Sequence, residues 1–111
     1  MHLRGTILIV SAGSGLSRKP RPMIVVQASR VDFPETLLVV PLTSSEVLEN
    51  AYTPLVVPDG RNGLQSESRA MVNRVGPIRK SQIGQVIGVL SERDLERIDA
   101  ALMIIFGLGF G

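Results

Sequence analysis

The sequence contains no cysteine and only one histidine, His2. Without cysteine the chain has no disulfides, no thiolate zinc sites and no thiol nucleophile, so its chemistry must rest on oxygen and nitrogen groups. His2 lies next to the start of the chain, where we expect a frayed and disordered terminus rather than a group that transfers protons. The composition therefore predicts a protein that works without a cofactor or a bound metal.

Long apolar runs are also missing. The first ten residues hold one short run that Arg4 interrupts, and no stretch is long enough to cross a bilayer, so we expect a cytoplasmic protein with no membrane partner. Residues 11–20 hold two glycines and three serines, but neither GxxxxGK[ST] nor GxGxxG is present. We expect a mobile, solvated loop there and no nucleotide-binding fold.

The chain has enough apolar residues for one core. They make up 44% of its 111 residues, which predicts a single domain over residues 1–111. The net charge is only +2, but residues 61–80 hold four arginines and one lysine against Glu67 alone. Arginine suits phosphate recognition, although scattered surface arginines are equally common.

A β-hairpin is the centre of the predicted fold. Residues 23–26 and 37–40 are aliphatic runs, and the turn residues between them are centred on Asp32. Counting from that turn sets Gln27 opposite Leu37 and Arg21 opposite Thr43. A guanidinium and a hydroxyl would then share the open end of the hairpin.

Further short strands are predicted on both sides of this hairpin. The run at 5–10 is apolar on both faces, the segment 53–57 has a proline that favours a sheet edge, and 83–90 forms a last strand. Residues 67–75 roughly alternate, which predicts a strand with Arg69, Met71 and Asn73 on one face. Strands therefore dominate, in a strongly bent sheet or small barrel.

The C-terminal part predicts one α-helix. Ser91 is a candidate N-cap with Asp94 three residues later, and apolar residues from Leu95 to Ile105 recur at helical spacing. Gly107 predicts a left-handed stop. Residues 102–106 are five consecutive apolar positions, more than one-sided packing requires, so we expect a two-fold homodimer in which some of them face the partner.

Several motifs in this order resemble the MazF/PemK (Kid) toxins of bacterial type II toxin–antitoxin systems. These motifs are GTILIV, Arg21-Pro22 followed by MIVVQ, VVPLTS, Asn62-Gly63-Leu64, IGQVIGVLS and the terminal helix ERDLERIDAALMIIFGL. The resemblance implies a mainly β fold (β-rich α+β), an SH3-like barrel of five to seven strands with a C-terminal α-helix. It also implies a homodimeric, metal-independent endoribonuclease that cleaves single-stranded mRNA and is inhibited by a cognate antitoxin.

The resemblance implies that Arg21 and Thr43 are catalytic. Arg21 would face the crowded phosphate, while Thr43 would hold a phosphate oxygen or the 2′-hydroxyl. A single strand needs a longer polar track, which we predict at Arg18, Lys19, Ser44, Arg69, Asn73, Arg74 and Lys80.

The chain departs from this family in its acid–base groups. Many members carry an acid or a histidine in the loop before Arg21, and many carry an acid where this chain has Asn73, which cannot act as a base. Three alternatives follow. The protein is a slow nuclease, a nuclease that depends almost entirely on Arg21, or an RNA-binding protein that does not cleave.

A different toxin class is also considered. Residues 106–108 resemble the end of the helix in CcdB, a gyrase poison, although we favour a helix stop with a buried aromatic residue.

Overall fold

The computed structural model describes residues 2–11, 19–45 and 50–109 of the chain. The predicted loop at 11–20 lies mostly outside the described residues, and so does the predicted RNA contact Arg18.

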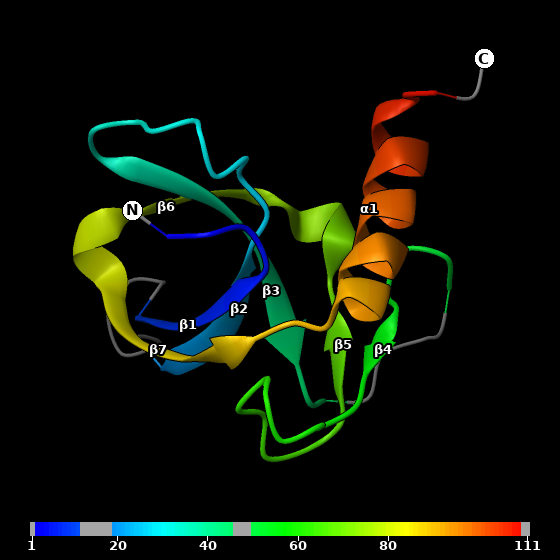
Figure 1. Cartoon of the computed structure of the whole chain (residues 1–111), viewed down its shortest axis with the longest axis horizontal. Coiled ribbons are helices and arrows are strands. Elements are labelled where there is room, and N and C mark those ends of the chain that lie inside the picture. The colour runs from blue at the N-terminus through cyan, green and yellow to red at the C-terminus, as the bar shows by residue number, and fades with distance from the viewer. Residues whose placement is uncertain (1, 12–18, 46–49, 110–111) are drawn as a thin grey trace.

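The described residues form seven strands in one antiparallel sheet (Figure 1). The strand order is β4-β5-β3-β2-β1-β7, and β6 pairs with β3 outside this path. The sheet curls into a half-barrel with the helix α1 on one side, so the prediction of a mainly β fold with one C-terminal helix is confirmed. The strands are β1 (Thr6–Ser11), β2 (Pro20–Val25), β3 (Thr36–Thr43), β4 (Leu55–Val56), β5 (Ser68–Ala70), β6 (Gly76–Arg79) and β7 (Ile83–Val89).

The strand β3 creates the curl because it changes partner along its length. Its first half pairs with β6, from Thr36 opposite Arg79 to Val39 opposite Gly76. Its last two residues pair with β5, and Thr43 lies opposite Arg69. Along its other edge β3 pairs with β2. One long strand therefore joins the two parts of the sheet at an angle.

The predicted hairpin register is confirmed where the strands pair. Met23 lies opposite Pro41 and Val25 opposite Val39, which is the register counted from the turn. Beyond Val25 the pairing changes, because the backbone N–H of Leu38 donates to the side-chain oxygen of Gln27. The amide nitrogen of Gln27 donates to the carbonyl of Val31, at 2.6 Å, and so closes the turn.

Both faces of the sheet are apolar, as the run at 5–10 predicted. Ile7 and Ile24 belong to a cluster that includes Ile98 of the helix, whereas Leu8 and Val10 belong to a second cluster on the other face. All five are fully buried. Each such side chain contributes about 1.5–3 kcal/mol of hydrophobic stabilisation, so this alternation fixes the register of β1.

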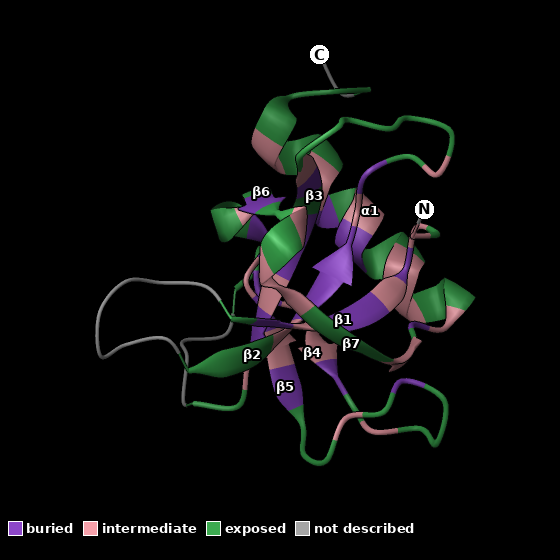
Figure 2. Cartoon of the chain, turned by 90° about the vertical axis from the view of Figure 1, so that its left-hand side faces the viewer, coloured by how far each residue is buried: buried purple, intermediate pink, exposed green. Residues whose placement is uncertain are grey.

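The helix α1 (Glu92–Phe106) begins and ends where the sequence predicted. The N–H of Asp94 donates to the hydroxyl oxygen of Ser91, and Gly107 has the left-handed φ of 66°. Its last turn is largely exposed (Figure 2), and Phe106 is 58% exposed, so the prediction of a buried aromatic is wrong for the single chain. In the described part of the chain, no helix has the length and apolar character needed to cross a membrane.

The segment predicted as one strand at 67–75 is only partly a strand. After β5 the chain forms the short 3₁₀ helix η2 (Val72–Arg74), and a second one, η3 (Lys80–Gln82), follows β6. The N–H of Val72 donates to the carbonyl of Tyr52, and its side chain enters the core beside the helix. Because this turn breaks the alternation, Asn73 does not share a strand face with Arg69.

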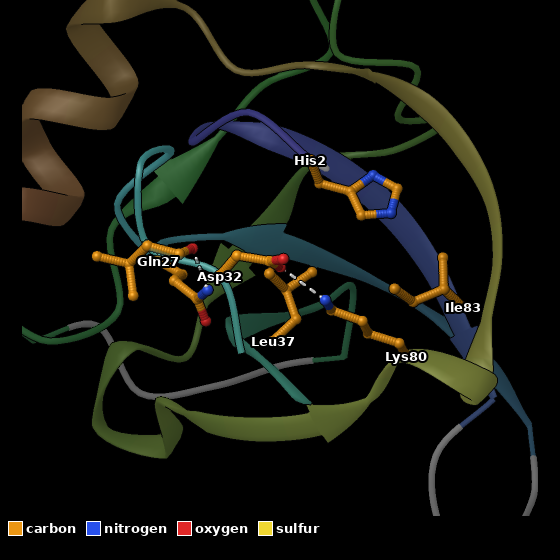
Figure 3. Close-up of a pocket in the computed structure, with 7 residues that line it drawn as sticks. His2, Gln27, Asp32, Leu37, Lys80 and Ile83 are labelled. Atoms are coloured by element: carbon orange, nitrogen blue, oxygen red, sulfur yellow. Dashed lines mark hydrogen bonds and ion pairs between the residues drawn. The ribbon is translucent and has the colours of Figure 1, made fainter. Parts of the chain in front are cut away.

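The N-terminal segment is tied to the rest of the fold. The guanidinium of Arg4 forms two bonds to the carboxylate of Asp99 on α1, and its Nε donates to the carbonyl of Val26. The expectation that His2 is disordered is therefore wrong, since His2 is half-buried and lines a small hollow (Figure 3).

Candidate active site

Arg21 and Thr43 line the same cleft at the open end of the hairpin. The cleft has a volume of about 380 Å³. Continuing the observed register by two residues beyond Met23 and Pro41 places Arg21 opposite Thr43. Lys19 and Ser44 line the cleft as well, so the structure brings together four of the predicted site residues.

The position of Arg21 in β2 is set by its neighbours. Arg21 lies between Pro20 and Pro22, whose rings fix their own φ angles and hold a preceding residue in an extended conformation. The side chain is exposed, and within the described residues it forms no salt bridge and no hydrogen bond. Its charge is therefore free to meet an anion that enters the cleft.

The hydroxyl of Thr43 is held in place by the backbone. Its Oγ1 accepts the N–H of Ser45 at 3.2 Å, and the residue is half-buried. Because a hydroxyl can accept one bond and donate another, the Thr43 proton remains available to an oxygen of a ligand.

The other predicted RNA contacts do not line this cleft. Arg69 donates to the carbonyl of Thr53 at 3.0 Å, and Asn73 and Arg74 lie exposed in η2. Lys80 lies at a different hollow, where its Nζ is 2.8 Å from the carboxylate of Asp32 (Figure 3). The hydrogen bond and charge of Lys80 lower the pKa of Asp32. The residues predicted to contact RNA therefore do not all line one cleft, and a role in RNA binding stays a prediction for Arg69, Asn73, Arg74 and Lys80.

One wall of the cleft consists of residues that the sequence analysis did not select. The segment after Asn62-Gly63 contributes Gln65 and Ser66, and β7 contributes Gln85. Gln85 belongs to the motif IGQVIGVLS, and Gln65 and Ser66 directly follow the motif Asn62-Gly63-Leu64, but only the fold shows that they line the same cleft as Arg21. None of the described residues lining the cleft is an acid or a histidine.

The segment 58–66 is fixed by hydrogen bonds from its side chains to the backbone. The carboxylate of Asp59 accepts the N–H groups of Arg61 and Asn62, and these bonds lower the pKa of Asp59. Asn62 is fully buried, and its side chain donates to the carbonyl of Val57 and accepts from the N–H of Leu64. The cleft wall is therefore rigid at its base.

The fold and the cleft define a small β-rich protein in which an arginine of β2 and a threonine of β3 line one cleft. Comparison with known proteins identifies its class. The family profile of the PemK-like, MazF-like toxins of type II toxin–antitoxin systems matches residues 3–106. The chain belongs to this family, as its motifs predicted.

One curated relative and several solved structures are similar over nearly the whole chain. A protein of Mycolicibacterium smegmatis, "Probable endoribonuclease MazF", is 30% identical over 105 residues, which cover 95% of this chain and 96% of the relative. The solved structures of lower identity support the fold. An endoribonuclease in complex with its cognate antitoxin, from a mycobacterial species, has a TM-score of 0.78 at 17% identity and covers 100% of both chains. The Mycobacterium tuberculosis toxin MazF-mt6 has a TM-score of 0.76 at 21% identity, over 95% of this chain and 99% of that one.

Proposed function

We propose that this chain is a metal-independent endoribonuclease toxin that cleaves single-stranded mRNA in the cytoplasm. The observation that carries the proposal is the meeting of Arg21 and Thr43 in one cleft of a MazF-family fold. RNA carries its own nucleophile, the 2′-hydroxyl. The protein therefore needs only groups such as Arg21 and Thr43 that hold and stabilise the phosphate.

The reaction follows from where charge develops. The 2′-oxygen attacks the neighbouring phosphorus, the O2′–P bond forms and the P–O5′ bond breaks, which gives a 2′,3′-cyclic phosphate and a 5′-hydroxyl. The crowded phosphate gains negative charge in the transition state, and the unpaired guanidinium of Arg21 stabilises it. The hydroxyl of Thr43 donates to a non-bridging oxygen and keeps the phosphate in line.

Proton transfer in this proposal relies on solvent. The described lining of the cleft offers no carboxylate or imidazole that could take the 2′-proton or return one to the 5′-oxygen. Arg21 therefore supplies most of the acceleration, and we expect a slow enzyme.

We also propose that the protein is a homodimer. Met103 and Phe106 are 38% and 58% exposed, and because they are three positions apart they share one face of the last turn of the helix, which stands away from the sheet in Figure 1. Adjacent apolar exposure of this kind is typical of an association surface. A two-fold axis beside the helix would bring two basic clefts together.

A cognate antitoxin is the second proposed partner. An acidic, partly disordered segment could occupy the RNA path, with Arg18, Lys19 and Arg74 as its anchors. The similar mycobacterial endoribonuclease is known in complex with its antitoxin.

The decisive experiment incubates the purified protein with single-stranded RNA in EDTA and, separately, with gyrase and supercoiled DNA. We expect RNA cleavage that EDTA does not reduce and products with cyclic phosphate and 5′-hydroxyl ends. Loss of cleavage in EDTA, or 5′-phosphate ends, would contradict the mechanism. Trapped gyrase–DNA complexes without RNA cleavage would instead identify a gyrase poison, and RNA binding without cleavage would identify a binding module.

A further inference from the structure

The strand β7 is irregular where it passes the cleft, because its register against β1 shifts between Ile7 and Leu8 and again between Leu8 and Val10. Leu8 of β1 lies opposite Val86, and Val10 lies opposite Ile83. One residue of β1, Ile9, is therefore opposed by two residues of β7, Gly84 and Gln85. This arrangement is a β-bulge, a feature that redirects a side chain and is frequent beside active sites.

The bulge decides which face of the sheet Gln85 occupies. In a regular ladder from Val10 and Ile83, Gln85 would lie opposite Leu8 and share its face. The extra residue moves Gln85 to the other face, where it lines the cleft together with Ile9 and Ile87. Gly84 permits the close approach, since a Cβ added there would lie 3.3 Å from the carbonyl oxygen of Ile9.

The amide of Gln85 has no structural task. The side chains of Gln27 and Gln82 both form hydrogen bonds to the backbone, which fix a turn and a 3₁₀ helix. Within the described residues, the Gln85 side chain forms no hydrogen bond and is exposed in the cleft. Gln65 also faces the cleft, but it belongs to a loop, whereas a strand positions a side chain more closely.

The cleft has two chemically different halves. The half at the ends of β2 and β3 holds the charges of Lys19 and Arg21, which suit phosphate. The lining contributed by Gln85 and the segment 64–66 is neutral; the side chains of Gln65, Ser66 and Gln85 are exposed, whereas Leu64 and Ile87 are half-buried. Half-buried apolar side chains beside exposed amide and hydroxyl groups suit a nucleobase, which has apolar faces and a hydrogen-bonding edge.

We propose that Gln85 is a specificity-determining residue that reads the nucleobase next to the cleaved phosphate, with adenine favoured. The carbonyl oxygen of the amide would accept from the adenine N6 amino group, while its NH₂ would donate to the ring nitrogen N7, a pair of groups that the other three bases do not present together. This proposal rests on the proposed RNA cleavage and adds the recognition of sequence to it.

The test uses short single-stranded RNAs that differ only in the base at each position flanking the cleaved bond. The wild type should favour adenine at one position by about 5- to 150-fold, the range expected for a bidentate amide–base contact. Gln85→Ala should bring the four bases to near parity at that position while cleavage continues. Gln85→Glu, which accepts but does not donate, should shift the preference toward cytosine.

The matched control is Val86→Ala, the next residue on the same strand. Val86 is 56% exposed and does not line the cleft, so this variant should keep the wild-type preference. Circular dichroism of each variant checks that the fold is retained. If Gln85→Ala keeps the wild-type preference while Arg21→Ala strongly lowers the cleavage rate, the base-reading role is wrong and the proposed function stands.

Binding separates the two proposals if the wild type cleaves none of the RNAs. The proposed cleavage then fails, and fluorescence anisotropy with the same labelled RNAs measures base preference directly. An adenine preference that Gln85→Ala removes supports the reading role. Equal binding of all four bases by the wild type overturns it.

Discussion

Gly63 lies directly against the backbone of Ile87. A Cβ added to Gly63 would stand 2.1 Å from the carbonyl oxygen of Ile87, closer than any real side chain approaches. Gly63 also has the positive φ of 72°. This contact joins the cleft segment 64–66 to β7, and it holds the two sides of the neutral half of the cleft at a fixed separation.

Replacing Gly63 with alanine should therefore destabilise the protein by more than the cost of its φ angle. A left-handed alanine costs about 1–2 kcal/mol, and overpacking against rigid backbone adds about 1–3 kcal/mol. Gly60→Ala is the matched control, because Gly60 has φ of 81° but nothing within 4 Å of the added Cβ. Urea denaturation measures both, and equal losses for the two variants would show that the Ile87 contact relaxes freely.

Removing the charge of Arg21 should damage catalysis without damaging the fold. Arg21→Ala should lower the cleavage rate by about 10²- to 10³-fold, the usual effect of losing a group that stabilises transition-state charge. Thr43→Ala should have a smaller effect because it removes a neutral hydrogen bond. Single-turnover cleavage and thermal melting measure rate and fold separately.

Arg74→Ala tests the alternative position of the active site, because Arg74 is a predicted RNA contact outside the cleft. Arg74 is an exposed arginine of η2 that does not line the cleft. A large rate loss in Arg74→Ala beside a near-normal Arg21→Ala would move the active site from this cleft to the region of η2.

The salt dependence of RNA binding should distinguish lysines that contact phosphate from those with structural partners. Lys19 lines the cleft, so Lys19→Ala should reduce the slope of log K against log salt by about 0.7, the contribution of one phosphate on a single strand. Lys80 pairs with Asp32 at a different hollow, so Lys80→Ala should reduce the slope less than Lys19→Ala does, and an equal reduction would show that Lys80 contacts phosphate as predicted. If the affinity of the wild type for RNA does not depend on salt, the cleft does not bind phosphate.

A charge at the end of the helix should separate the proposed dimer. Phe106→Glu would place a carboxylate on the apolar surface and should give a monomeric mass in light scattering at micromolar concentration, whereas the wild type should give a dimeric mass. Phe33→Glu is the control, because Phe33 is 44% exposed in the turn between β2 and β3. A monomeric wild type would remove the dimer and the joined clefts with it.

Features with a local cause could be predicted from the sequence. The cap at Ser91, the stop at Gly107 and the hairpin register each depend on residues close together in the chain, and the structure has all three. The strand β6 was not predicted, because Pro77 and Gly76 argue against a strand. Proline is tolerated there since β6 pairs on one side only, with β3.

The strand predicted through Asn73 fails for a related reason. Alternation at 67–75 is compatible with a strand, but the hydrogen bond from Val72 to Tyr52 and the space beside the helix select a 3₁₀ turn instead. A tertiary contact of this kind outweighs a weak β pattern.

The sequence by itself determined the family, the mainly β character and the hairpin register that brings Arg21 and Thr43 to the same end, because motifs, patterning and turn position are local properties of the chain. Only the tertiary structure decided which polar groups share the cleft. Lys80 lies with Asp32, and Arg69 is bound to the carbonyl of Thr53. Gln85 enters the cleft because a bulge adds one residue to β7, and a ladder between strands more than seventy residues apart carries no local signal of where such a residue is inserted.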